Sequence, residues 1–85
     1  MKKKYTVYIT KTVQKQIAKL PNNVADRIEA KMLSLEDNPR PPETKKLKGR
    51  NAYRLRVGKY RFIYDIQDNI LVVEIIKIAH RKDIY

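Results

Sequence analysis

The feature that most constrains the fold of this sequence is a pair of alternating segments, residues 53–57 and 60–66, joined by Gly58 and Lys59. Apolar or aromatic side chains recur at every second position of both segments, as they do in half-buried strands. A two-residue loop that begins with glycine favours a type II′ turn, which closes a β-hairpin. The sequence therefore predicts two antiparallel strands in a fixed register. The opposed pairs are Val57 and Tyr60, Arg56 and Arg61, Leu55 and Phe62, and Tyr53 and Tyr64.

Ahead of the hairpin, the sequence predicts a short strand and a first helix. Residues 5–9 alternate in the manner of a strand, with Tyr5, Val7 and Ile9 on one side. Thr10 or Thr12 can cap the helix that follows, because a threonine hydroxyl accepts a hydrogen bond from a free backbone N–H at a helix start. The apolar stripe of this helix is Val13, Ile17 and Leu20, and Pro21 interrupts it.

A second helix is predicted to start at Asn22 and Asn23 and to end at Asn38-Pro39. Asp26 is expected in its first turn, where a negative charge is favoured by the helix dipole. Its apolar positions recur at helical spacing: Val24, Ile28, Met32 and Leu35. Arg40-Pro41-Pro42 then reads as an extended connector to the hairpin.

After the hairpin, a tight turn at Asp68 and Asn69 leads into a last strand over residues 70–78. The order is strand, helix, helix and then a three-stranded meander. The predicted fold class is α+β with the order β-α-α-β-β-β, in which a helical hairpin packs on one face of a small sheet rich in antiparallel pairs. With only 85 residues, the chain is expected to form a single domain over residues 1–85.

Composition excludes several classes of site. The chain has no cysteine, which removes disulfides and thiolate ligands and favours a reducing compartment. His80 is the one histidine, so we expect no histidine-based metal cluster, no metal site and no cofactor. Lys2, Lys3 and Lys4 follow Met1 without the apolar segment of a signal peptide, and the apolar run of residues 70–78 is too short for a bilayer. A cytoplasmic protein is therefore expected, with no membrane contact.

The positive charge of the chain indicates an anionic binding partner. The formal net charge is +11, and residues 45–64 hold eight basic and no acidic side chains. Such an excess destabilises the compact chain by self-repulsion, so a polyanion that relieves it is the natural partner. Nucleic acid or an acidic protein fits this description, whereas solubility alone normally needs a smaller charge.

The hairpin register places Arg54, Arg56 and Arg61 on one face, with Arg56 directly across from Arg61. Like charges in that position are destabilising, which points to a phosphate held between planar guanidinium groups. A solvated hairpin face is the alternative. The other basic side chains expected to bind RNA phosphates are Lys46, Lys48, Arg50 and Lys59. The three hairpin tyrosines share the parity of Leu55 and Phe62, which favours core packing over base stacking.

His80 is the second informative residue, because its side chain has an ordinary pKa suited to proton transfer near neutrality. Continued alternation of the last strand places His80 on the face of Arg61, beside a phosphate held there. A lone histidine is also commonly structural, and this alternative stays open. The same alternation sends Arg81 to the opposite face unless the strand ends or bulges.

The sequence resembles the RelE/ParE superfamily of bacterial and archaeal toxins, in particular its RelE branch. The resemblance rests on YRLRVGKYRFIY at residues 53–64, KLKG at residues 46–49 and AHRKDIY at residues 79–85, and it covers essentially the whole chain. It implies the toxin of a type II toxin–antitoxin pair that cuts mRNA in the ribosomal A site. In that family the 2′-hydroxyl attacks the adjacent phosphate without metal.

The resemblance also implies roles for individual residues. Arg61 and Arg81 would stabilise the transition-state phosphorane, and Tyr85 would stack on or orient a base. His80 would be the general acid or base; some relatives use a glutamate, and no acidic residue lies between Lys45 and Tyr64. Arg54 and Arg56 occupy positions where some relatives carry lysine.

The implied partners are the ribosome, mRNA and an acidic antitoxin encoded next to the toxin, which would assemble with it into a heterotetramer. Two alternatives remain: a DNA gyrase inhibitor of the ParE kind without nuclease activity, and a noncatalytic RNA-binding module.

Overall fold

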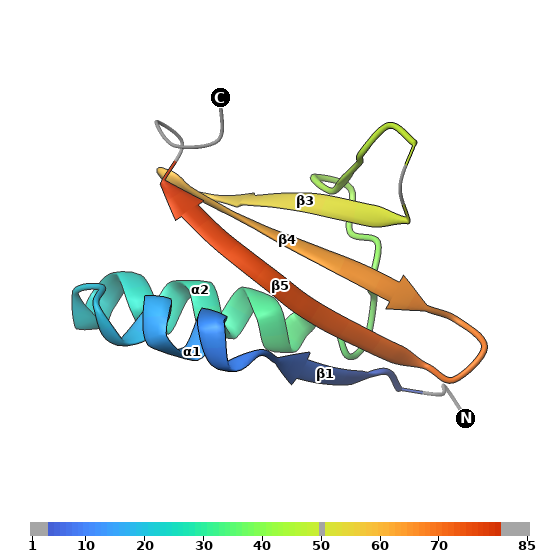
Figure 1. Cartoon of the computed structure of the whole chain (residues 1–85), viewed down its shortest axis with the longest axis horizontal. Coiled ribbons are helices and arrows are strands. Elements are labelled where there is room, and N and C mark those ends of the chain that lie inside the picture. Colours follow the sequence, from blue (N-terminus) through green and yellow to red (C-terminus); the bar gives the residue numbers. More distant parts are fainter. Residues whose placement is uncertain (1–3, 50, 81–85) are drawn as a thin grey trace.

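The structure, a computed structural model, describes residues 4–49 and 51–80. Its elements are β1 (Thr6–Ile9), α1 (Lys11–Ala18), α2 (Asn22–Ser34), β2 (Lys45–Lys46), β3 (Ala52–Val57), β4 (Tyr60–Gln67) and β5 (Val72–His80). The five strands form one sheet in the order β1-β5-β4-β3-β2, in which β1 is parallel to β5 and the other neighbours are antiparallel. Both helices lie on the same face of this sheet (Figure 1). The predicted α+β fold is confirmed, and β2 is an additional short edge strand.

The predicted hairpin is confirmed in every pair. Val57 lies opposite Tyr60, and Arg56 opposite Arg61, with the remaining pairs following in the same register. At the turn, Gly58 has a φ of +59°, whereas Lys59 does not adopt a positive φ. A positive φ at the first loop residue alone is what a type II′ turn requires, and glycine adopts it without steric strain.

Of the two residues expected at the helix starts, Thr10 has the predicted role and Asp26 does not. Thr10 caps α1, because its hydroxyl oxygen accepts a hydrogen bond from the backbone N–H of Val13 at 3.3 Å. The expectation for Asp26 is wrong: α2 begins at Asn22 directly after Pro21, so Asp26 falls in the second turn, where the dipole effect has faded. Neither helix is long and apolar enough to cross a membrane.

The core lies between the helices and the hairpin face that carries the tyrosines. Tyr64 is fully buried, and Tyr53 and Tyr60 are half-buried against the same cluster, which confirms that these rings pack in the core. The buried members of the cluster are Val13, Ile28, Met32, Leu35, Leu55, Phe62, Tyr64, Ile66, Val73, Ile75 and Ile78. Burial of the strand members of this cluster on one sheet face fixes the register, because a slip of a strand by one residue would turn its buried side chains to the other face.

The last strand differs from the prediction in two ways. It starts at Val72, because Leu71 has a φ of +54° within the turn and Ile70 is 57% exposed. It also contains a β-bulge: Tyr64 pairs with Ile75 while Ile63 pairs with Lys77, which leaves Ile76 as an extra residue. A bulge of one residue reverses the parity of everything that follows it in the strand.

Arg40 anchors the connector between α2 and β2 to the sheet through Tyr53 and through an ion pair with Asp68. Arg40 donates to both carboxylate oxygens of Asp68, at 3.1 and 2.8 Å, and through Nε to the Tyr53 hydroxyl at 3.2 Å. The Tyr5 hydroxyl donates to the same carboxylate at 2.6 Å. Arg40, and then Tyr5, hold the pKa of Asp68 down at about 2. Because this pair is exposed, it orders the connector more than it stabilises the fold.

Tyr64 holds the other part of the connector from inside the core. Its hydroxyl donates to the carbonyl oxygen of Pro39 at 2.8 Å and lies 2.9 Å from the hydroxyl of Thr44. Since a tyrosine has one hydroxyl proton, Thr44 is the donor in the second bond. Burial raises the pKa of the Tyr64 hydroxyl, which keeps it a donor throughout the neutral range.

Replacing this buried tyrosine by phenylalanine therefore leaves a buried carbonyl without its donor. We expect Tyr64→Phe to lower the free energy of unfolding by about 1–3 kcal/mol. Tyr8→Phe, the same chemical change at a side chain that is 57% exposed, is the control and should shift it by less than about 0.5 kcal/mol. Urea unfolding followed by circular dichroism measures both. Equal stability of the two variants would contradict the role given to the Tyr64 hydroxyl.

Candidate nucleic-acid interface

The sheet face opposite the helices carries the predicted arginines. Arg54 and Arg56 lie two residues apart on β3, and Arg61 lies directly across from Arg56 on β4. In the described part of the chain no helix covers this face (Figure 1). The prediction that these three side chains share one face is confirmed.

These arginines line a pocket of about 300 Å³ together with Lys45 and Glu43, hereafter the cationic pocket. Arg56 donates through Nε to the carbonyl oxygen of Gly58 at 3.1 Å, which holds its guanidinium against the hairpin. Four cationic side chains face one acidic side chain, so the pocket repels cations and attracts anions. Guanidinium groups match the oxygens of a phosphate with paired donors, so an RNA phosphate is a fitting occupant.

Glu43 and Lys45 are members of the pocket that the sequence did not indicate. The short strand β2 brings them there, because Lys45 pairs with Arg54 at the edge of the sheet. Glu43 also forms an ion pair with Lys31 of α2 at 3.0 Å. Alternation offers a weak signal for Lys45, but only if β2 is known to pair with β3. For Glu43 the sequence carries no signal, since it is adjacent to the pocket only through the fold.

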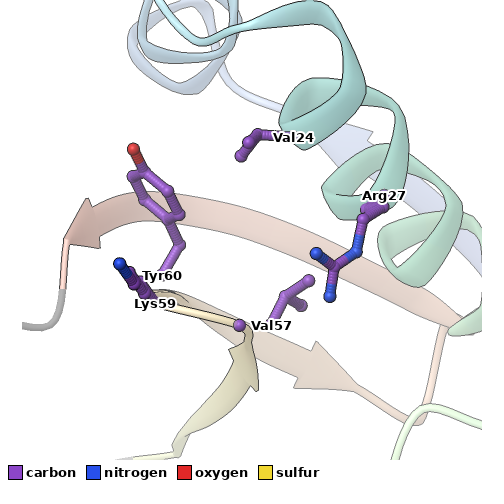
Figure 2. Close-up of a pocket in the computed structure, with 6 residues that line it drawn as sticks. Val24, Arg27, Val57, Lys59 and Tyr60 are labelled. Carbon is purple, nitrogen blue, oxygen red and sulfur yellow. The ribbon is translucent and has the colours of Figure 1, made fainter.

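The remaining lysines of the basic segment do not join the cationic pocket. Lys46 pairs with Tyr53, whose ring packs on the helix side of the sheet, and Lys48 is exposed in the turn after β2. Lys59 lies at the tip of the hairpin and lines a second pocket of about 310 Å³. Figure 2 shows this second pocket, in which Val24 and Arg27 of α2 face the hairpin.

Three other predicted site residues, Arg50, Arg81 and Tyr85, lie outside the described residues.

His80 is not where alternation placed it. It pairs with Tyr60 instead of lying on the face of Arg61, and the two rings meet edge to face with centroids 5.1 Å apart. The cause is the bulge at Ile76, which turns His80 to the helix side and leaves Ala79 opposite Arg61. His80 therefore lies on β5, the strand next to that of Arg61, but its side chain is on the other side of the sheet from the cationic pocket.

Residues 4–49 and 51–80 contain no group of three or more histidine, aspartate and glutamate side chains that could hold a metal ion. The chemistry that the described part of the site supports is electrostatic, because several fixed guanidinium groups can stabilise charge that develops on a phosphate.

The fold and the cationic pocket define a class: small α+β proteins that present a basic sheet face on a scaffold of two helices. The family model of the ParE toxin of type II toxin–antitoxin systems, parDE, matches residues 7–85. The putative toxin RelE1 of Methanocaldococcus jannaschii is 34% identical over 96% of both chains. Toxin RelG of Mycobacterium tuberculosis is 34% identical over 95% of both chains.

A solved structure has the same fold and a similar sequence. The archaeal RelE–RelB complex from Pyrococcus horikoshii superposes with a TM-score of 0.85 and 34% identity, covering 94% of this chain and 98% of the other. The chain therefore belongs to the RelE/ParE superfamily and is a RelE-like toxin of a type II toxin–antitoxin system.

The cationic pocket predicts how binding of RNA depends on salt. Each phosphate contact that is lost reduces the slope of log K against log salt by about 0.7 for a single strand. We expect Arg56→Ala to reduce the slope by that amount, whereas Lys15→Ala on the helix side, the matched control, leaves it unchanged. Fluorescence anisotropy with a single-stranded RNA oligonucleotide at several KCl concentrations measures the slope. The same slope in Arg56→Ala and the unsubstituted protein would place the RNA elsewhere.

Proposed function

We propose that this toxin is an endoribonuclease that cuts mRNA in the ribosomal A site without a metal ion. The observation that carries the proposal is the cationic pocket, in which three arginines and a lysine surround Glu43. Glu43 lies among these cations and is also ion-paired with Lys31 of α2 at 3.0 Å. A carboxylate at that place serves a reaction in which a proton must be removed near a phosphate.

The proposed reaction begins at the 2′-hydroxyl of a nucleotide whose 3′-phosphate lies in the cationic pocket. Glu43 takes the hydroxyl proton as the 2′-oxygen bonds to phosphorus. The bond from phosphorus to the 5′-oxygen of the next nucleotide then breaks, and that oxygen takes a proton from water. The hydroxide left behind takes the proton from Glu43, which restores the carboxylate. The products are a 2′,3′-cyclic phosphate and a free 5′-hydroxyl. Arg54, Arg56 and Arg61 stabilise the negative charge on the phosphorane, which is expected to be the largest contribution.

The last residues of the chain complete the proposal on the basis of the family resemblance. Arg81 supplies a further positive charge that stabilises the phosphorane, and Tyr85 orients a base. His80 packs against Tyr60 on the other side of the sheet, and we therefore assign it a supporting role at the end of β5 in place of proton transfer.

The proposed partners follow from the same charge. The solved relative from Pyrococcus horikoshii is a complex of RelE with RelB. We propose that an acidic antitoxin, encoded next to this toxin, covers the cationic pocket and assembles with the toxin into a heterotetramer in the cytoplasm. Antitoxin and mRNA would then compete for the same arginines.

A second candidate function is inhibition of DNA gyrase without nuclease activity. The observation that favours it is the family model that matches residues 7–85, which is that of a ParE toxin. Under this alternative, substitutions of Glu43 would have no effect on toxicity, since no proton is transferred.

Substitution in the cationic pocket tests the nuclease proposal. We expect Arg61→Ala to lower the rate of cleavage of ribosome-bound mRNA by about 100-fold or more. Glu43→Gln should lower it by about 100-fold. His80→Ala should lower it by less than about tenfold, because His80 contacts no phosphate in this proposal. Purified toxin, ribosomes programmed with a defined mRNA and mapping of the 5′ ends give the rates.

Lys15→Ala on α1 is the control for a general loss of positive charge. Cleavage at the unsubstituted rate by both Arg61→Ala and Glu43→Gln would overturn the mechanism. Intact mRNA together with inhibited gyrase supercoiling would establish the second candidate instead.

A further inference from the structure

The end of β5 extends beyond the strand that flanks it. The parallel pairing of β1 with β5 ends at Ile9 and Ile75, and the backbone N–H of Thr10 adds one long bond to the Ile75 carbonyl at 3.4 Å. β5 continues to His80. Past Ile75, the outer edge of β5 has no strand partner among the described residues. Backbone groups at such an edge must find other partners or remain hydrated.

Gln16 of α1 supplies that partner. Its side-chain amide donates through Nε2 to the carbonyl oxygen of Ile78 at 2.8 Å and accepts through Oε1 from the N–H of the same residue at 2.9 Å. A primary amide carries one donor and one acceptor side by side, as a neighbouring strand would. The Ile78 side chain is 4% exposed, so both bonds lie next to the core.

These two bonds hold β5 directly after its bulge. Ile78 is the second residue after the extra residue Ile76, at the point where the strand has just reversed its parity. With Ile78 held opposite Phe62, Ala79 falls opposite Arg61 and His80 opposite Tyr60. Without an outer partner, the bulge could move along the strand, and the residues after it would change faces.

We propose that Gln16 is a positioning residue, which locks the register of the end of β5 and thereby keeps Ala79 opposite Arg61 and His80 opposite Tyr60. This inference rests on the proposed nuclease function, in which Arg61, the neighbour of Ala79 across the sheet, stabilises the phosphorane. Gln16 lies on the helix side and does not contact RNA in this arrangement. Its effect reaches the reaction only through the strand, so it should change the rate of the chemical step and leave ribosome binding unchanged.

Gln14 provides a matched control within the same helix. Its side-chain amide also donates to a backbone carbonyl, that of Ile9 at 2.9 Å, but this carbonyl belongs to β1. Gln14→Ala and Gln16→Ala thus remove the same chemical group and a similar hydrogen bond. Only the second substitution frees the end of β5.

The experiment has a structural and a kinetic measurement, both on the full chain. In Gln16→Ala, amide hydrogen exchange at Ile78 should accelerate by about tenfold or more, and the ring-to-ring NOE between Tyr60 and His80 should weaken. The kcat for cleavage of ribosome-bound mRNA should fall by about 10- to 100-fold, the loss typical of a misplaced group, with KM within about twofold. Gln14→Ala should match the unsubstituted protein in all of these.

If Gln16→Ala does not fold, Gln16→Glu replaces it, because glutamate keeps the acceptor for the Ile78 N–H and lacks the donor. Unchanged exchange at Ile78, or a kcat equal to that of Gln14→Ala, would overturn the inference. An unsubstituted toxin that leaves ribosome-bound mRNA intact would overturn the nuclease proposal. In that case, faster exchange at Ile78 and a weaker Tyr60–His80 NOE would still support the part of the inference that concerns the register of β5.

Discussion

The turn at Gly58 and Lys59 is the constraint on which the rest of the structure depends. It sets the register of β3 against β4, and a strand can place its side chains on only two faces. One face receives Leu55, Phe62 and Tyr64 and becomes the floor of the core under the helices. The other receives Arg54, Arg56 and Arg61 at the same step, so core and cationic pocket are consequences of one turn.

Repulsion between the opposed arginines lowers the stability of the fold. Arg56 and Arg61 face each other across a hairpin, an arrangement that opposes folding, and Lys45 adds a further positive charge beside Arg54. The core on the other face must offset this repulsion, because the exposed Arg40–Asp68 pair contributes little. An anion in the pocket removes the repulsion, which is the physical reason why we propose both mRNA and an acidic antitoxin as its ligands.

What the sequence could predict was local. The hairpin register, the cap at Thr10 and the shared face of the three arginines depend on residues close together in the chain, and all three are confirmed. Most of what it missed depends on distant partners. The bulge at Ile76 turned His80 to the other face, and the groups that pack against this part of β5, such as Gln16, lie far away in the sequence. Glu43 and Lys45 reach the arginines only because the connector folds back as an edge strand. Asp26 is a local miss: Asn22 is already the first helical residue of α2, directly after Pro21, so Asp26 falls in the second turn.

The ends of the RNA products show whether the cationic pocket performs the proposed phosphoryl transfer from a 2′-oxygen. Purified toxin would be incubated with ribosomes that hold a defined mRNA, with EDTA present at a level that leaves the ribosomes assembled, and the product ends identified by mass spectrometry. Transfer from a 2′-oxygen is expected to give fragments that end in a 2′,3′-cyclic phosphate and begin with a 5′-hydroxyl. Fragments with 5′-phosphates, or mRNA that stays intact, would contradict it.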